Sequence, residues 1–218
     1  MPEDYGLAEE REGADGDEWA DLDVSDDEAD RIARQQDRDF THFLERLKDA
    51  DQFKATGAVF DDATYAAIYK LVQDDHLTAM GGPISSGKEA IVFEGLAPDD
   101  EDVAVKIYRV STSDFKQMAD YLEGDPRFEG VRNDKKAVVV AWTQKEFSNL
   151  ERAREAGVRV PEPLGVQRNA LVMELIGEEG DAAPTLHDVE IENPQTAYEV
   201  IREYMWRLYA AGLVHGDL

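Results

Sequence analysis

Cysteine is absent from this 218-residue chain, which excludes disulfide scaffolds, thiolate nucleophiles and cysteine-ligated zinc or iron–sulfur sites. Long apolar segments are missing as well. The longest run, Ala137–Trp142, has six residues, whereas a helix that crosses a bilayer needs about 20. The acidic start of the chain does not match the basic and then apolar pattern of a secretory signal. We therefore expect a soluble, cytoplasmic protein.

Positive charge is scarce. The chain has 23 Lys and Arg residues against 49 Asp and Glu residues, and its net charge is −26. Residues 1–30 alone hold 14 acidic side chains and one basic side chain, Arg11. Such a segment cannot bury enough apolar surface to offset its ordering entropy, so we predict an acidic disordered tail over residues 1–30. A short docking motif at Trp19, Leu22 and Val24 is the alternative.

The rest of the chain is also acidic, which bears on its partners and habitat. Proteins bind nucleic-acid phosphates mainly through Lys and Arg, so we expect neither a basic patch for nucleic acid nor a membrane partner. A strongly anionic surface is also typical of proteins that stay soluble in very high salt, where charge repulsion is screened. This second interpretation concerns habitat and not activity.

The spacing of apolar residues divides the chain after the tail into helices and short strands. Residues 31–76 are predicted to hold two helices, at 31–50 and from Asp61 or Asp62 to Val72. Residues 77–176 are predicted to hold five strands, at 77–82, 90–95, 103–109, 164–167 and 170–176, with an irregular stretch at 111–136 and a helix at 137–156. Residues 177–184 are predicted to be a linker, and a last helix runs from the N-cap Asn193 to Gly212.

This order predicts an α+β fold. Residues 77–176 would form a five-stranded antiparallel lobe with one inserted helix, and residues 177–218 would form the beginning of a helical lobe.

Ser85, Ser86, Gly87 and Lys88 connect the first two predicted strands. Small residues and a glycine let backbone N–H groups approach an anion closely, and Lys88 adds a positive charge. The segment is neither a Walker loop nor the three-glycine loop of most kinases. By itself it is better explained as an ordinary hairpin turn.

Lys106 lies in the middle of an apolar predicted strand, on the face opposite Val105 and Ile107. A lysine there is costly to bury unless an anion or a carboxylate meets it. Glu146 shares one face of the 137–156 helix with Trp142 and is the natural partner. The alternatives are an edge-strand lysine that points to water and a glutamate at the solvated margin of its helix.

Two further segments complete the pattern. Leu171–Gly177 is a strand that runs directly into the predicted linker. His215-Gly216-Asp217-Leu218 follows the glycine cap of the last helix. A strand lysine paired with a helix glutamate, followed by His-x-Asp-Leu after a further helix, is the order of elements in protein kinases.

On these residues the chain resembles the RIO family of atypical serine/threonine protein kinases, and within it the type 1 branch. The resemblance covers residues 85–218. It is carried by the following segments: 85–90, 106–109, 112–116, 121–128, 145–150, 172–174 and 215–218. It implies a protein-kinase-like fold with a five-stranded N-lobe that includes the helix kinases call C, and the start of a helical C-lobe.

The resemblance also implies ATP and Mg²⁺ as cofactors and assigns roles to residues. Lys106 would contact the phosphates and pair with Glu146, while the loop of Ser85, Ser86, Gly87 and Lys88 would cover the phosphates. Met173 would be the gatekeeper, and Glu174 and Ile176 would contact adenine through their backbones. Asp217 would be the catalytic aspartate.

The metal-binding asparagine and aspartate of the family would lie after Leu218, so no metal ligand is assigned in this chain. We accordingly expect the 218 residues to be a fragment that lacks phosphoryl transfer while its parent has it. The last helix is expected to expose apolar surface.

Family members act in maturation of the small ribosomal subunit, and three functions remain open. The parent could phosphorylate serine or threonine on proteins, or it could act as an ATPase-type ribosome-assembly factor through a phosphoaspartate. It could also be a non-catalytic nucleotide-binding scaffold. Outside kinases, an acidic interaction module would leave Lys106 and Glu146 unexplained.

Overall fold

The computed structural model describes residues 60–110, 115–122, 125–129, 131, 134–178 and 181–216. The predicted acidic tail, the predicted helix at 31–50 and the predicted catalytic residue Asp217 all lie outside these residues. None of the helices in the described ranges has both the length and the apolar character needed to cross a membrane.

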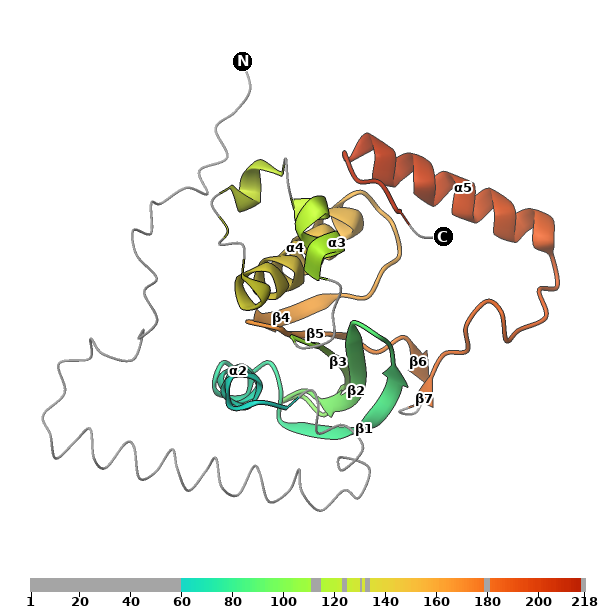
Figure 1. The fold of residues 1–218 in the computed structure, drawn as a ribbon. Helices are drawn as coiled ribbons and strands as arrows, with labels where there is room; N and C mark the ends of the chain where they lie inside the picture. Colours follow the sequence, from blue (N-terminus) through green and yellow to red (C-terminus); the bar gives the residue numbers. More distant parts are fainter. Residues whose placement is uncertain are drawn as a thin grey trace, which may run out of the picture. The chain divides into compact units, whose positions relative to one another are not determined.

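The centre of the molecule is an antiparallel sheet with the strand order β1-β2-β3-β5-β4 (Figure 1). Its strands are β1 (Ala79–Ser86), β2 (Ala90–Leu96), β3 (Asp102–Tyr108), β4 (Pro163–Gln167) and β5 (Ala170–Glu174). The predicted five-stranded antiparallel sheet is confirmed. The first strand starts two residues later than predicted and continues through Ser86, and the last ends at Glu174 rather than Ile176.

Helix α2 (Asp62–Gln73) covers one face of the sheet. It starts where predicted, because the Asp61 side chain accepts a hydrogen bond from the backbone N–H of Thr64 at 2.8 Å. Its buried residues Ile68 and Leu71 belong to the same apolar core as inward-facing residues of the sheet. These strand residues are Ile91, Phe93, Val103, Val105, Ile107 and Val172, each exposed by 1% or less.

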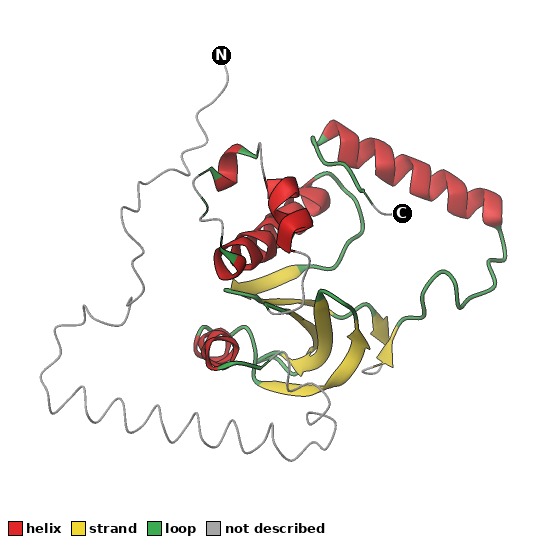
Figure 2. Ribbon diagram, in the orientation of Figure 1, coloured by secondary structure: helices red, strands yellow, loops and turns green. Residues whose placement is uncertain are grey.

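Helices α4 (Lys135–Glu155) and α3 (Phe115–Leu122) lie on the opposite side of the sheet from α2 (Figure 2). The prediction of an irregular stretch over 111–136 was wrong for α3 and for the short 3-10 helix η2 (Pro126–Phe128). The surrounding polar residues obscured a short apolar face. Met118 and Leu122, one helical turn apart, pack with Val138 and Val139 of α4 in a small second core.

Two short strands, β6 (Gly177–Glu178) and β7 (Asp181–Ala182), form a hairpin after β5, where a plain linker had been predicted. Helix α5 (Pro194–Ala210) follows, with Asn193 as N-cap and Gly212 just after its end, both as predicted. The expectation of exposed apolar side chains on this helix is confirmed. Trp206 and Tyr209 are each more than 60% exposed.

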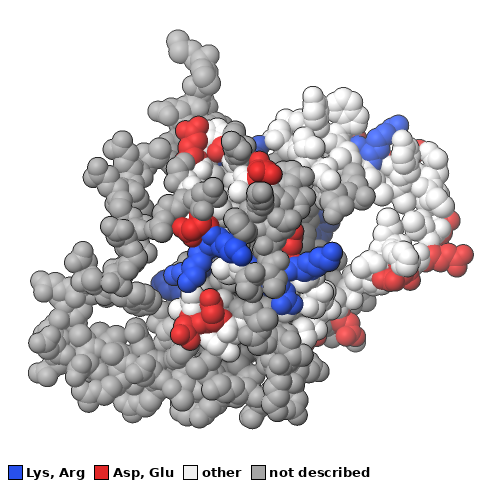
Figure 3. Space-filling model, viewed as in Figure 1, with Lys and Arg blue, Asp and Glu red and all other residues white. Residues whose placement is uncertain are grey.

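Charged side chains are unevenly spread on the surface. Figure 3 shows Lys and Arg side chains gathered near the middle of one face of the described part, with Asp and Glu side chains around them. A local concentration of positive charge therefore exists despite the overall excess of acidic residues.

Candidate functional site

Lys106 of β3 and Glu146 of α4 meet in the space between the sheet and the helix. Their Nζ and Oε1 atoms are 2.6 Å apart, so the predicted contact is confirmed. Both side chains are about a quarter exposed, at 23% and 24%. In the sheet register Lys106 lies between Val92 and Leu171, and these apolar neighbours leave the ammonium partly desolvated. An ammonium in such surroundings needs an anionic partner.

Tyr108 gives the glutamate a second contact. Its hydroxyl donates a short hydrogen bond to Oε2 of Glu146, and the Lys106 ammonium lies 4.9 Å from the centre of the Tyr108 ring. Burial, together with the nearby Glu146 carboxylate, raises the pKa of Tyr108 far above its ordinary value, so the hydroxyl stays protonated and acts as a donor. Both carboxylate oxygens are thereby fixed, and the position of the ammonium with them.

No role was predicted for Tyr108 from the sequence, although a signal was present. Strand alternation places residues 106 and 108 on the same face, two positions apart. A polar hydroxyl on that face, beside a lysine with a carboxylate partner, is a candidate for the same network.

The loop of Ser85, Ser86, Gly87 and Lys88 is exposed and closes a hairpin between β1 and β2, with the Gly87 N–H donating to the carbonyl of Ala90 at 2.9 Å. The hairpin interpretation is therefore correct, and it does not exclude a role in covering an anion. Ala90 pairs with Tyr108, so the loop lies at the end of β3 that is nearer to Lys106.

Arg109 ties this loop to β3, a role the sequence analysis missed. Its backbone N–H donates to the carbonyl of Glu89 at 2.7 Å. Its guanidinium donates to the carbonyl of Gly87 at 3.3 Å and to Oγ of Ser86 at 3.2 Å. The loop thus carries a positive charge held close to its backbone, which favours an anionic ligand.

Met173 and Glu174 lie at the opposite end of β3, where they pair with Ala104 and Val103. The carboxylate of Glu174 accepts two hydrogen bonds from Arg159, at 2.8 and 2.5 Å, and Arg159 holds its pKa below the ordinary value. The backbone N–H of Glu174 donates to the carbonyl of Glu162 at 2.8 Å. A ligand contact from Glu174 would therefore have to come from its carbonyl oxygen.

Ile176 has its own carbonyl engaged, because that oxygen accepts a hydrogen bond from the N–H of Ala183 at 2.7 Å. A ligand contact from Ile176 would therefore use its N–H. The carbonyl of Glu174 and the N–H of Ile176 form an acceptor and donor two residues apart, which suits a flat heterocycle that offers one donor and one acceptor.

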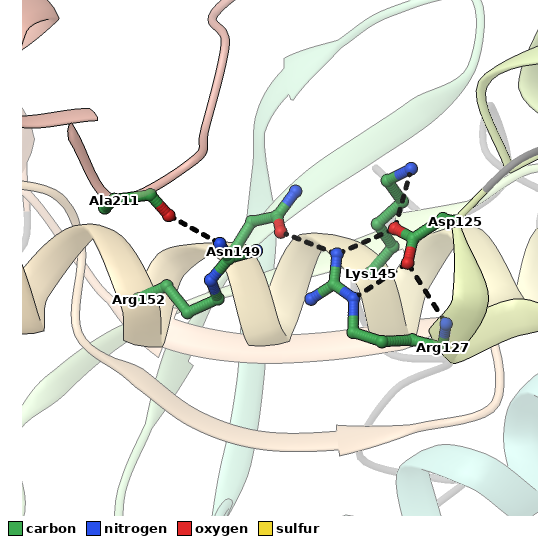
Figure 4. A network of polar contacts seen from close by, with 6 residues as sticks. All are labelled: Asp125, Arg127, Lys145, Asn149, Arg152 and Ala211. Carbon is green, nitrogen blue, oxygen red and sulfur yellow. Dashed lines mark hydrogen bonds and ion pairs between the residues drawn. The ribbon is translucent and has the colours of Figure 1, made fainter. Parts of the chain in front are cut away.

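A second polar cluster joins Asp125 and Arg127 to Lys145 and Asn149 of α4 (Figure 4). Asp125 accepts hydrogen bonds from Nε and Nη2 of Arg127, at 3.0 and 2.8 Å, and lies 3.2 Å from Nζ of Lys145. Arg127 also donates to Oδ1 of Asn149 at 3.3 Å. The guanidinium of Arg127 holds the pKa of Asp125 well below its ordinary value. This cluster fastens the segment after α3 to the helix that carries Glu146.

The structure brings only part of the predicted site together. Lys106 and Glu146 touch, with the 85–88 loop at one end of β3 and Met173 at the other. His215 is exposed after α5, and the predicted catalytic Asp217 lies outside the described residues. No group of three or more His, Asp or Glu side chains within the described ranges could hold a metal ion.

Comparison with known proteins finds relatives of a single family. The RIO domain family profile matches residues 91–218. The chain is 68% identical over 219 residues to the RIO-type serine/threonine-protein kinase Rio1 of Haloferax volcanii, covering all of this chain and 76% of that protein. It is 41% identical over 177 residues to the protein of the same name from Methanocaldococcus jannaschii, covering 81% of this chain and 58% of the relative.

A solved structure shares the fold. The crystal structure of the Rio2 kinase–ADP/Mg²⁺–phosphoaspartate complex from Chaetomium thermophilum superposes with a TM-score of 0.51 at 22% identity, over 67% of this chain and 41% of that one. The fold is therefore protein-kinase-like, as predicted.

Proposed function

The chain belongs to the RIO family of protein kinases, and from this premise we propose that it binds ATP between the sheet and α4 and transfers the γ-phosphoryl group to serine or threonine hydroxyls. The observation that carries the proposal is the contact between Lys106 and Glu146, which holds an ammonium on an otherwise apolar strand. Kinases use a lysine on the same strand, held by a helix glutamate, to bind nucleotide phosphates.

Each part of the site has a distinct task in this proposal. Glu146, held by Tyr108, orients Lys106 toward the phosphates. The 85–88 loop, tied down by Arg109, covers the phosphates from above with N–H groups and Lys88. The carbonyl of Glu174 and the N–H of Ile176 bind the adenine edge, and Met173 lies behind it. Asp217 accepts the proton of the substrate hydroxyl or orients that hydroxyl for in-line attack.

Mg²⁺ neutralises charge on the transferred phosphoryl group when it is bound, and we assign it to none of the described residues. We also propose that the protein acts in the cytoplasm, on the maturing small ribosomal subunit.

A second candidate uses the same site with a different outcome. In it, the protein hydrolyses ATP to drive its release from a ribosomal precursor, with little phosphorylation of other proteins. The Rio2 complex with ADP and a phosphoaspartate motivates this alternative.

Nucleotide binding by charge variants of the full-length protein tests the proposed site. Lys106→Met removes the phosphate-binding ammonium, and we expect ATP affinity to fall about 100-fold or more, or about 2.7 kcal/mol. Asp217→Ala should leave ATP affinity within about twofold and abolish turnover, because a catalytic aspartate stabilises only the transition state. Calorimetric titration and a turnover assay measure the two quantities.

Lys70→Met is the matched control, because Lys70 is a half-exposed lysine on α2, on the other face of the sheet. It should leave both ATP affinity and turnover unchanged. If Lys106→Met binds ATP as tightly as the control, the assigned site is wrong.

Labelled ATP separates the two candidate functions. Transfer of the γ-phosphate label to serine or threonine of an added protein supports the kinase. Release of free labelled phosphate, accelerated by ribosomal precursor particles and with no labelled protein, supports the ATPase.

A further inference from the structure

The sequence Arg-x-x-x-Ala-Gly occurs at the end of both α4 and α5. In α4 it is Arg152 with Ala156 and Gly157, and in α5 it is Arg207 with Ala211 and Gly212. Each arginine lies in the last turn of its helix, five residues before the glycine. The two helices therefore carry the same short motif at the same place, although they share no other evident similarity.

The two motifs also have the same backbone structure. Gly157 and Gly212 both adopt the left-handed conformation, with φ of 74° and 71°. In each case the residue after the glycine reaches back to close the helix end. Val158 donates to Ala153 at 3.0 Å, and Leu213 donates to Leu208 at 2.8 Å.

Each arginine caps the end of the other helix. Nη2 of Arg152 donates to the carbonyl of Ala211 at 2.6 Å, as Figure 4 shows. Nη1 of Arg207 donates to the carbonyl of Gly157 at 2.6 Å. The two hydrogen bonds run in opposite directions between the same pair of helix ends, so the contact is reciprocal.

Helix chemistry makes this a favourable arrangement. The last carbonyl groups of a helix have no partner within the helix and carry partial negative charge, so a guanidinium is a strong partner for them. Glu203 accepts a hydrogen bond from Nε of Arg207, which orients that side chain. A Cβ atom at Gly157 would lie 3.0 Å from Nη1 of Arg207, so the glycine also leaves room for the guanidinium.

The location of the contact links two parts of the proposed kinase site. Helix α4 carries Glu146, less than two turns before Arg152. Helix α5 leads within a few residues to His215 and Asp217. A contact that fixes the ends of these helices to each other constrains the helix of the phosphate-binding pair relative to the segment of the catalytic aspartate.

We infer that Arg152 and Arg207 form a reciprocal arginine latch, a pair of positioning residues that sets the placement of α5, and of His215 just after it, relative to the Lys106–Glu146 pair. This inference rests on the proposed function for its kinetic consequence. The latch itself is a property of α4 and α5, whatever reaction the site performs.

Kinetic constants of the full-length protein test the role in positioning. In Arg152→Met and Arg207→Met the donor is lost while the bulk of the side chain is largely kept. We expect kcat to fall about tenfold or more, because small displacements of reacting groups are costly, while KM for ATP stays within about twofold. Arg152→Lys and Arg207→Lys keep one donor at the end of a long side chain and should recover most of the lost kcat.

Arg154→Met is the matched control, because Arg154 lies on the same helix and pairs with Glu162 within the sheet lobe. It should leave kcat unchanged. Three outcomes overturn the inference: an unchanged kcat in both latch variants, an equal loss of ATP affinity and kcat, or lysine variants no better than the methionine variants.

A spectroscopic readout does not depend on activity. Because the chain has no cysteine, Glu151→Cys on α4 and Val200→Cys on α5 accept spin labels at two defined places, and both positions are exposed. The inter-label distance distribution should broaden when either latch arginine is replaced by methionine. An unchanged distribution overturns the latch, whereas a missing reaction in the unsubstituted protein contradicts only the proposed function.

Discussion

The two faces of the central sheet are built from the same strands but differ in the interactions that their side chains make. The face under α2 is apolar, since Phe93, Val105 and Ile107 of the sheet and Ile68 of that helix are all fully buried. The face under α4 carries the Lys106 network, in which the charged side chains of Lys106 and Glu146 are about a quarter exposed and Tyr108 is buried. Strand alternation alone separates them, because neighbouring residues of β3 point to opposite faces.

This difference separates stability from chemistry. Apolar burial is non-directional and insensitive to pH, so the α2 face can hold the sheet together under any protonation state. Ion pairs and charge-assisted hydrogen bonds are directional, and they fix a functional group such as the Lys106 ammonium in place. A charged functional group therefore lies on the α4 face without weakening the apolar core.

The largest predicted effect tests the α2 face. Phe93→Ala removes a fully buried ring at the centre of the apolar core and should lower the free energy of unfolding by about 3–5 kcal/mol. Chemical denaturation in high salt measures this loss, and Phe93→Leu, which keeps most of the apolar volume, should cost less than about 1.5 kcal/mol. The ATP affinity of the folded fraction should not change. A large loss of affinity without a loss of stability would mean that the two faces are not separate.

Sequence patterns predicted a strand and a helix of the α2 face, although not that this helix covers the sheet. The alternation in Val103, Val105 and Ile107 and the helical spacing of Ile68 and Leu71 are both strong periodic signals. The starts of two helices could be predicted from the N-cap residues Asp61 and Asn193, because the side-chain oxygen of each accepts a local backbone hydrogen bond. These signals are local, and they can be read without any knowledge of tertiary contacts.

The α4 face was predicted only in part, since its contacts join residues that are far apart in the chain. The Lys106–Glu146 contact could be predicted because each residue is a charged side chain on an otherwise apolar face of its strand or helix. The roles of Tyr108 and Arg109 were not predicted. Strand alternation places Tyr108 on the same face as Lys106 but does not identify its hydrogen-bond partner, and an arginine at a strand end has many possible partners. Helix α3 was missed because a short helix owes its stability to packing on α4 rather than to its own pattern.

A second prediction tests how the α4 face orients Lys106. Tyr108→Phe removes the hydroxyl that donates to Glu146 and keeps the buried ring. Hydrogen bonds to charged groups contribute about 1.5–3 kcal/mol, and we expect the free energy of unfolding to fall by about 1.5 kcal/mol. We also expect ATP affinity to fall several-fold. Glu146 would still contact Lys106, but its second carboxylate oxygen would lose the hydrogen bond that fixes its position.

Denaturation and nucleotide titration of the same Tyr108→Phe sample measure both effects. Tyr65→Phe, a substitution on α2 and thus on the other face, is the control that should leave ATP affinity unchanged. Equal ATP affinity in the two variants would show that Tyr108 has no part in orienting the lysine.

The smallest predicted effect concerns Asp125, whose carboxylate fastens the segment after α3 to α4. Arg127 holds the pKa of Asp125 below its ordinary value of 3.8. A carboxyl with a depressed folded-state pKa contributes stability that is fully present above the unfolded-state value and is lost as the pH falls through the folded-state value. Asp125→Asn should therefore lower the free energy of unfolding by about 1 kcal/mol or less at neutral pH.

The pH dependence of this loss distinguishes the charged α4 face from the apolar α2 face. The stability difference between the unsubstituted protein and Asp125→Asn should be constant from neutral pH down to about pH 5. It should shrink progressively below about pH 4, where the unfolded chain takes up a proton at residue 125 that the folded carboxylate, with its depressed pKa, does not take up. The loss caused by Phe93→Ala should stay the same over that range, and the exposed Asp74→Asn is the charge-matched control. A difference for Asp125→Asn that persists undiminished at the acid end would mean that the cluster stabilises α4 by packing rather than by charge, and that both faces of the sheet depend on the same kind of interaction.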